Sequence, residues 1–360
     1  RDQLIEAQLR FDSNLIHFND GTEEDNYRHG SWHRSPEVNV IGLTTIYGNV
    51  YTTLATRNAL HLLEVAGRTD IPVAEGSHVY LQLFFVFFPC TKKTTKLRAA
   101  GFVHGLDGLG NQNFPQPKTK PIEKSAAEYL VEQAGLYPGE ITVLALGPLT
   151  NIALAIELDP SFNENIGQII LLGGAFLVNG NVNPASEANI STDPEAAEIV
   201  FTCGADVLAI GLNVTRQVIL KDHDRDILAG SDGIFAKYLS KILEFYFSYH
   251  RDTYNMKGIY LHDPTTILAA VNPSLMTYTE GVVGVQTTGI TRGQLSLFSN
   301  EQKRCFITNR RRQSRKGHVL IRWVGFNEET GCCKKPTVKV AVTVDAPRVN
   351  DKKNASSFKT

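Results

Sequence analysis

The chain has 360 residues, of which 42% are hydrophobic and 20% are charged. This composition is typical of a globular protein with one large domain or two ordinary ones. The 36 basic and 37 acidic side chains leave a formal net charge of −1, which excludes a chain-wide field that recruits nucleic acid or anionic membranes. The five cysteines form no CxxC pair and are too sparse for a disulfide scaffold, so reduced thiols are expected.

No part of the sequence reads as a targeting or membrane segment. The strongly apolar run from Val79 to Pro89 is about eleven residues long, whereas a bilayer span needs about twenty. The first residues, Arg1 to Glu6, are charged and lack the apolar core of a signal peptide. We therefore expect a cytosolic protein that is neither secreted nor inserted in a membrane.

Apolar runs alternate with helical patterns between residues 38 and 290. Buried strands are predicted at 38–46, 141–146, 168–172 and 206–212, and a further strand at 337–344. Helices are predicted at 52–66, after Gly147, from Asp193, at 237–249 and after Pro264. Strands separated by helices favour an α/β fold, a mostly parallel, Rossmann-like open sheet with helices on both faces.

Two stretches interrupt this alternation, one near 79–95 and one near 299–335. We interpret both as insertions in a single domain at 35–347, which follows an atypical segment at 1–34 and precedes a disordered tail at 348–360. The second insertion holds a basic cluster at 303–316. It is either a nuclear signal or RNA contact, or a solvated loop, and the neutral total charge favours the loop.

Polar or glycine-rich turns follow four of the predicted strands, at 44–49, 146–151, 173–174 and 211–213. Ligands of open α/β sheets bind beyond the carboxyl ends of the strands, so these turns are expected to converge. The segment 173–189 carries four asparagines and one glutamate. Such side chains can bind several hydroxyls at once, as on a ribose, but the segment taken in isolation favours a turn cluster with local hydrogen bonds.

Five motifs follow one another in a fixed order along the chain. They are Thr44-Thr-Ile-Tyr-Gly-Asn49, His104-Gly-Leu-Asp-Gly-Leu-Gly-Asn111, Leu146-Gly-Pro-Leu-Thr-Asn-Ile-Ala153, Asn181-Val-Asn-Pro-Ala-Ser-Glu-Ala-Asn189 and Leu261-His-Asp-Pro264. In this order they resemble the inosine/uridine-preferring nucleoside hydrolases, and most of all the plant uridine/purine ribohydrolases. The resemblance implies hydrolysis of the N-glycosidic bond of ribonucleosides (uridine, inosine, xanthosine or similar) to free base and ribose, in nucleoside catabolism and salvage.

The resemblance also assigns roles to individual residues. It implies a Ca²⁺ ion, which prefers hard oxygen ligands, bound by the Asp263 carboxylate and the Leu146 backbone carbonyl. Asp263 and His262 form the catalytic pair, with His262 as the acid that protonates the leaving base. Substrate binding is implied for the base-pocket residue His104 and for the ribose contacts Asn49, Asn181, Glu187 and Asn189. The expected partners are a nucleoside and further copies of the chain in a dimer or tetramer, with no nucleic acid and no membrane.

One motif of the family is missing. The family opens with a strand and the cluster Asp-x-Asp-Pro-Gly-x-Asp-Asp, which supplies the general base and most calcium carboxylates. Ahead of Ser35 this chain instead has Asp20, Glu23, Glu24 and Asp25, with no Pro-Gly turn and no preceding strand. We favour solvated loop acids in a replaced segment over acids that substitute for the cluster, so the calcium site is expected to be incomplete. The alternative to a working hydrolase is therefore an impaired relative that binds ribose or acts as an oligomerisation partner.

Overall fold

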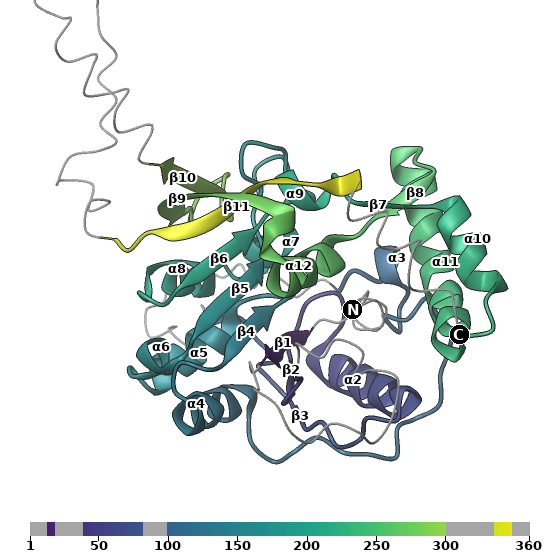
Figure 1. The fold of residues 1–360 in the computed structure, drawn as a ribbon, viewed down its shortest axis with the longest axis horizontal. Helices are drawn as coiled ribbons and strands as arrows, with labels where there is room; N and C mark the ends of the chain where they lie inside the picture. The colour runs from purple at the N-terminus through teal and green to yellow at the C-terminus, as the bar shows by residue number, and fades with distance from the viewer. Residues whose placement is uncertain (1–12, 19–38, 82–98, 300–334, 348–360) are drawn as a thin grey trace, which may run out of the picture.

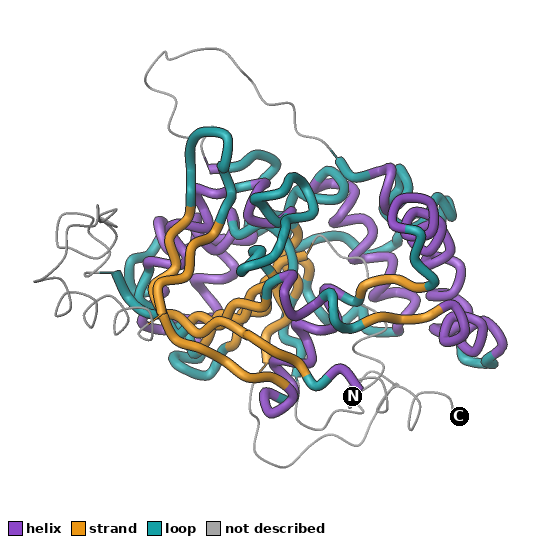
Figure 2. Tube along the Cα trace, turned by 90° about the horizontal axis from the view of Figure 1, so that it is seen from above, coloured by secondary structure: helices purple, strands orange, loops and turns teal. Residues whose placement is uncertain are grey.

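The computed structural model of the protein describes residues 13–18, 39–81, 99–299 and 335–347. Its central sheet has nine strands, with helices on either side (Figure 1). In spatial order the strands are β10 (Leu295–Ser299), β9 (Met276–Val285), β11 (Val338–Val344), β6 (Val207–Ile210), β5 (Gln168–Leu172), β4 (Thr142–Ala145), β1 (Ser13–Phe18), β2 (Leu43–Thr45) and β3 (Val73–Ala74). A separate two-stranded sheet pairs β7 (Ile219–Lys221) with β8 (Gly258–Tyr260), apart from the main sheet (Figure 2).

The directions of the strands confirm the predicted α/β class with a mostly parallel sheet. β1 is antiparallel to both its neighbours, β2 and β4, and β9 is antiparallel to both β10 and β11. All other neighbours in the sheet are parallel. The seven described strands other than β1 and β9 therefore point in one direction, and their carboxyl ends share one edge.

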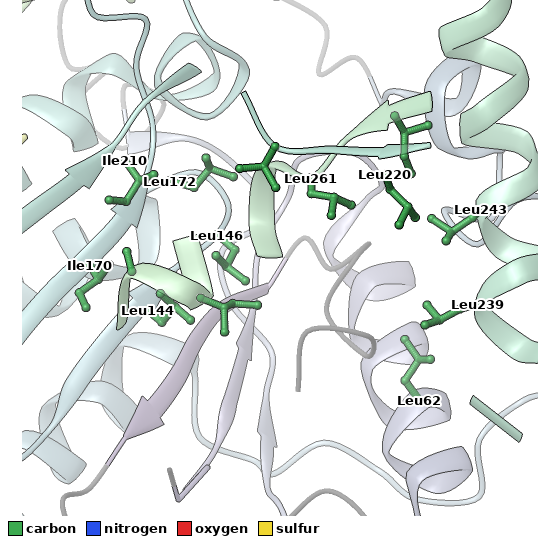
Figure 3. Close-up of a cluster of buried hydrophobic side chains, with 14 of the residues drawn as sticks. Leu62, Leu144, Leu146, Ile170, Leu172, Ile210, Leu220, Leu239, Leu243 and Leu261 are labelled. Atoms are coloured by element: carbon green, nitrogen blue, oxygen red, sulfur yellow. The ribbon is translucent and has the colours of Figure 1, made fainter. Parts of the chain in front are cut away.

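Each central strand serves two hydrophobic cores, because successive residues point to opposite faces of a sheet. On one face, Leu144 joins a buried cluster, part of which is drawn in Figure 3, with side chains from α2 (Thr52–Ala66), α11 (Ile234–Tyr254) and α12 (His262–Val271). On the other face, Val143 packs with side chains from α4 (Ala126–Leu136), α5 (Thr150–Leu158) and α8 (Pro194–Thr202). Helices on both faces are thus confirmed.

The remaining helices are short, apart from α10. They are α3 (Gly101–His104), α6 (Phe162–Asn165), α7 (Ala188–Thr192), α9 (Leu212–Thr215), α10 (Asp222–Gly230) and the 3₁₀ turn η3 (Pro273–Leu275). Two of them matter for the site, since α7 begins at the end of the asparagine-rich segment and α9 follows the carboxyl end of β6.

The element that differs most from expectation is β1. No strand was predicted ahead of the acids at 20–25, and this prediction was wrong. The six residues of β1 fill the slot between β4 and β2, where both neighbours need backbone hydrogen-bond partners. The strand runs backwards, however, since Asn14 pairs with Ala145 and Phe18 with Thr142. Phe18 therefore lies at the amino edge of the sheet, opposite to the edge where β4 ends.

Several predicted features lie outside the described residues. They are the acids Asp20, Glu23, Glu24 and Asp25, most of the two insertions, the basic cluster at 303–316 and the tail from 348.

Asp193 joins three segments of the buried structure and leads to a stability prediction. One carboxylate oxygen accepts the Ala196 N–H at 3.1 Å and caps α8, and the other accepts the Thr150 hydroxyl at 2.6 Å and the Leu81 N–H at 2.8 Å. Asp193→Ala is expected to lower the free energy of unfolding by about 2 kcal/mol or more, because a cap is lost and buried donors are left unpaired. Urea denaturation measures this loss.

The matched control is Asp159→Ala, which removes a carboxylate bonded to the exposed turn at Ser161. It should cost less than half as much, since water replaces those bonds. Equal losses for the two variants would contradict the structural role of Asp193.

Candidate functional site

Residues that follow β4 and β5 meet the asparagine-rich segment at the carboxyl edge of the sheet. The side-chain amide of Asn189 donates to the backbone carbonyl of Leu146 and to that of Leu172, both at 3.0 Å. Leu146 directly follows β4, and Leu172 is the last residue of β5. The segment 173–189 thus folds back across the ends of two neighbouring strands, as the convergence of the turns predicted.

The carboxylate of Glu187 holds this segment in shape. It accepts the N–H of Asn189 at 2.9 Å on one oxygen, and those of Gly174 and Ile190 at 3.1 Å on the other. Glu187 is 3% exposed and is the N-cap residue of α7. Burial raises the pKa of its carboxyl, and the backbone N–H donors oppose that shift. A buried carboxylate with three backbone donors is an acceptor-rich and rigid part of the site.

Asn181 lies on the exposed side of the same segment. Its side-chain oxygen accepts the Ala188 N–H at 2.9 Å, and its own N–H donates to the Ser186 carbonyl at 3.2 Å. The turn is so tight that a Cβ on Gly180 would lie 2.0 Å from the Ser186 carbonyl oxygen, so only glycine fits there. These contacts place Asn181 and Glu187 in one compact loop.

Arg216 and Thr215 connect this loop to the His-Asp-Pro motif. The Arg216 guanidinium donates from Nη1 to the Asn179 carbonyl at 2.7 Å and from Nη2 to the Gly180 carbonyl at 3.0 Å. The hydroxyl of Thr215, which is fully buried, lies 2.7 Å from Nδ1 of His262. The loop, the end of α9 and the first turn of α12 are therefore one hydrogen-bonded unit.

His262 is held as a neutral ring. Burial lowers its pKa to about 3, with further contributions from the nearby His250 and the positive charge of Arg216. Around neutral pH the ring therefore carries no extra proton, and one nitrogen is engaged by Thr215. The role as leaving-group acid stays a prediction, and it requires that bound substrate raise the pKa of His262 substantially.

A continuous series of rings leads from His262 to His104, the other histidine predicted from the sequence. The centroid distances are 5.6 Å from His262 to Tyr260, 5.6 Å on to His250, 4.3 Å on to Tyr246 and 5.2 Å on to His104. His104 and Tyr246 are stacked, with 20° between their planes. Because the two rings stack on each other, an outer face of the pair is the surface on which a planar heterocycle such as a nucleobase could stack.

The predicted calcium ligands can be tested against this geometry. Asp263 lies in the first turn of α12, and the Leu146 carbonyl already accepts a hydrogen bond from Asn189. Ca²⁺ usually takes six to eight oxygens. Within the described part of the chain, no group of three or more His, Cys, Asp or Glu residues could hold a metal. Among the described residues, the two predicted ligands therefore supply one carboxylate and one carbonyl, fewer oxygens than Ca²⁺ usually takes.

Asn49 follows β2 at the same carboxyl edge, and β4 and β1 lie between β2 and β5 in the sheet. Its backbone carbonyl accepts the Ala100 N–H at 2.8 Å, which links the end of β2 to α3 and so to His104. The structure thus brings the predicted residues into two groups. One contains Asn181, Glu187, Asn189 and Leu146, joined through Arg216 and Thr215 to His262 and Asp263, and the other contains Asn49 and His104.

Three residues of this site, Tyr246, Thr215 and Arg216, were not predicted from the sequence. Tyr246 lies within the predicted helix at 237–249, and its spacing from Tyr249 and His250 is the signal that could have identified an aromatic face. Thr215 and Arg216 stand only two and three residues beyond the polar turn that was predicted at 211–213. The position after a strand was therefore the available signal, although the sequence did not show what these side chains face.

Among the residues that the structure describes, no helix combines the length and the apolar character that crossing a bilayer requires.

Comparisons with known proteins show the family to which the chain belongs. A family model described as inosine-uridine preferring nucleoside hydrolase matches residues 29–351. The probable uridine nucleosidase 2 of Arabidopsis thaliana is 65% identical over 315 residues, which are 88% of each chain. Uridine nucleosidase 1 of the same plant is 45% identical over 88% of this chain and 84% of its own.

Solved structures give the same picture. A plant nucleoside hydrolase that is 49% identical superposes with a TM-score of 0.76, over 90% of this chain and 93% of its own. A purine-preferring ribonucleoside hydrolase from Gardnerella vaginalis, 30% identical, superposes with a TM-score of 0.71 over 89% and 90%.

Proposed function

Because the chain belongs to the inosine-uridine preferring nucleoside hydrolase family, we propose that it cleaves ribonucleosides at the carboxyl edge of its central sheet, with uridine as the preferred substrate. The observation that carries the proposal is the hydrogen-bonded unit that joins the loop at 179–189 to His262 and Asp263. Such a unit offers amides and a carboxylate to a ribose on one side and stacked rings to a base on the other.

The ribose end is assigned to Asn49, Asn181, Glu187 and Asn189. The Asn189 amide nitrogen is already engaged by two carbonyls, so its side-chain oxygen is the group offered to a hydroxyl. The Glu187 carboxylate is fixed by three backbone donors and needs no rearrangement before it binds. Contacts that strengthen as the sugar flattens toward an oxocarbenium ion accelerate the reaction as well as binding.

The base end is assigned to His104 and Tyr246. Stacking on these rings holds the leaving base in line with His262, which delivers a proton to it when substrate has raised the pKa of the ring. A Ca²⁺ ion, used generally in this family, would add ligation of water and ribose hydroxyls. Since the two predicted ligands supply fewer oxygens than this ion usually takes, no step assigned here to the chain's own residues depends on it.

A second candidate function is that of an impaired relative that binds nucleosides but turns them over slowly. The direction of β1 favours it, because this strand ends at the amino edge of the sheet beside Thr142 rather than near Leu146. The two candidates differ in rate and agree on the binding site.

The test of the proposed function is a reducing-sugar assay with uridine, inosine and xanthosine, together with calorimetric titration of ribose. Release of ribose, with uridine used best, is expected. Ribose binding without turnover would select the impaired relative. The absence of both ribose binding and turnover would refute the site. The cytosolic location and the homo-oligomeric state remain predictions from the sequence.

Tyr246 provides a separate test of the base end. Tyr246→Leu is expected to raise KM for uridine about 3- to 10-fold, because an aromatic stacking contact is worth about 0.5–1.5 kcal/mol. The control Tyr246→Phe keeps the ring and should stay close to the original KM. Steady-state kinetics with both variants decides, and an unchanged KM in Tyr246→Leu would place the base elsewhere.

A further inference from the structure

We propose that Arg216 is a positioning residue, which holds the loop at 179–189 so that Asn181 and Asn189 face the reacting sugar. The inference rests on the proposed function, because it takes this loop as the ribose-binding part of the site. It concerns a residue that would act through the loop and would not itself touch the substrate.

The guanidinium of Arg216 bridges two successive carbonyls. Its two terminal nitrogens reach Asn179 at 2.7 Å and Gly180 at 3.0 Å, and Asn181 is the next residue of the loop. The guanidinium presents its donors in a rigid planar fork, whereas the ammonium of a lysine is one compact group on a flexible stem and fixes direction less well. The contact therefore fixes both the position and the direction of the backbone that enters Asn181.

The other side of this contact is anchored in the core. Arg216 ends the short helix α9, and its N–H donates to the Leu212 carbonyl at 3.2 Å. Leu212, Val214 and Thr215 are at most 1% exposed, and the hydroxyl of Thr215 contacts His262. Arg216 thus ties the loop to the buried and rigid residues beside His262.

Apart from those made by Arg216, the hydrogen bonds described for the first end of the loop, residues 179–182, stay within the loop itself. Its second end is held by the Glu187 carboxylate and by the Asn189 amide. Just ahead of the first end, Leu177 is fully exposed and has a φ of +58°, a backbone conformation that costs energy for a residue with a side chain. A strained and solvated entry to the loop would relax if nothing held the residues that follow, and Arg216 holds them.

The charge of Arg216 is directed at the loop rather than at an acid. None of the ion pairs among the described residues includes Arg216. Its two described side-chain bonds go to neutral carbonyls, and such charge-assisted bonds are stronger than neutral ones. Removing the side chain would therefore leave no buried carboxylate unpaired, so the main consequence is expected in the loop.

The experiment compares Arg216→Ala, Arg216→Lys and the control Arg68→Ala. Arg68 donates to the Asp70 carboxylate ahead of β3, at the amino edge of the sheet. The variant Arg68→Ala therefore removes an arginine that is also hydrogen-bonded but is remote from the loop. The first measurement is hydrogen exchange of the peptide covering 177–189 in the full chain. The second is kcat and KM for uridine, with calorimetric titration of ribose.

Arg216→Ala is expected to speed exchange in 177–189 and to lower kcat/KM about 10- to 100-fold, because small misplacements of binding groups have effects of this size. The loss should appear mainly in kcat, and Arg216→Lys should recover only part of it. Arg68→Ala should change neither exchange in 177–189 nor kcat/KM, even where it lowers stability.

Unchanged exchange in Arg216→Ala would overturn the inference, as would faster exchange with unaltered kinetics and ribose affinity. If Arg216→Ala does not fold, Arg216→Lys carries the same two readouts. Failure of the proposed function is a different result, since the original chain would then neither bind ribose nor hydrolyse uridine, while hydrogen exchange would still report whether Arg216 holds the loop.

Discussion

Uridine hydrolysis by this chain is expected to be about 10²–10⁴-fold slower than by the same chain with a family-type aspartate strand and helix placed ahead of Ser35. The estimate is the usual contribution of a general base, and loss of a metal adds to it. The physical reason is the direction of β1, whose last residue, Phe18, pairs with Thr142 at the amino edge. A strand that runs parallel in the same slot would end beside Leu146 and Asn189, where carboxylates could join Asp263.

The measurement is a reducing-sugar assay on both chains, with and without a chelator. A graft whose aspartates are changed to asparagine is the matched control, and it should fold like the active graft but remain slow. Rapid, chelator-sensitive turnover by the unaltered chain would contradict the expectation, and would show that the acids at Asp20 to Asp25 complete the metal site.

Glu187→Ala is expected to have the second largest effect, on both stability and turnover. The substitution leaves the N–H groups of Gly174, Asn189 and Ile190 without their acceptor inside the protein. A buried donor without a partner costs about 1–3 kcal/mol, so a total loss of about 3 kcal/mol in the free energy of unfolding is expected. Because the same carboxylate holds the loop at 179–189 in shape, kcat should fall more than KM rises.

Urea denaturation and steady-state kinetics in an active form of the chain measure the two effects. Glu187→Gln keeps one acceptor oxygen and should fall between the original chain and Glu187→Ala. The control Glu164→Ala removes an exposed acid from α6 and should leave both properties unchanged. A Glu187→Ala variant with full stability and full kcat would remove Glu187 from both the loop and the mechanism.

The parts of the fold that could be predicted are those with strong local signals. The helix at 52–66 has the bounds predicted for it, and Gly67 takes the left-handed conformation at its end with a φ of 67°. Asp193 caps α8 as its position before a proline indicated. The meeting of Asn189 with Leu146 followed from a general rule, since parallel strands end at one edge.

The parts that could not be predicted depend on partners far away in the sequence. A six-residue strand can pair in either direction, and the direction of β1 is set by β4 and β2, which lie many residues further on. The fork of Arg216 contacts carbonyls 36 and 37 positions away. Hydrogen bonds to a backbone carbonyl leave no signature in the residue that accepts them, so this contact was invisible in the sequence.

The aromatic and histidine rings packed along α11 make the stability of the base end of the site depend on pH. Burial lowers the pKa of His250, which contacts Tyr246 and Tyr260, and that of His61, which stacks on Phe114. Both rings are therefore neutral in the folded chain at pH values where an unfolded histidine, with a pKa of about 6.5, already takes up a proton. Unfolding therefore takes up protons, and the free energy of unfolding decreases as pH falls below about 6.5. Acid is thus a solvent condition that opposes the packing of α11, the helix that carries Tyr246.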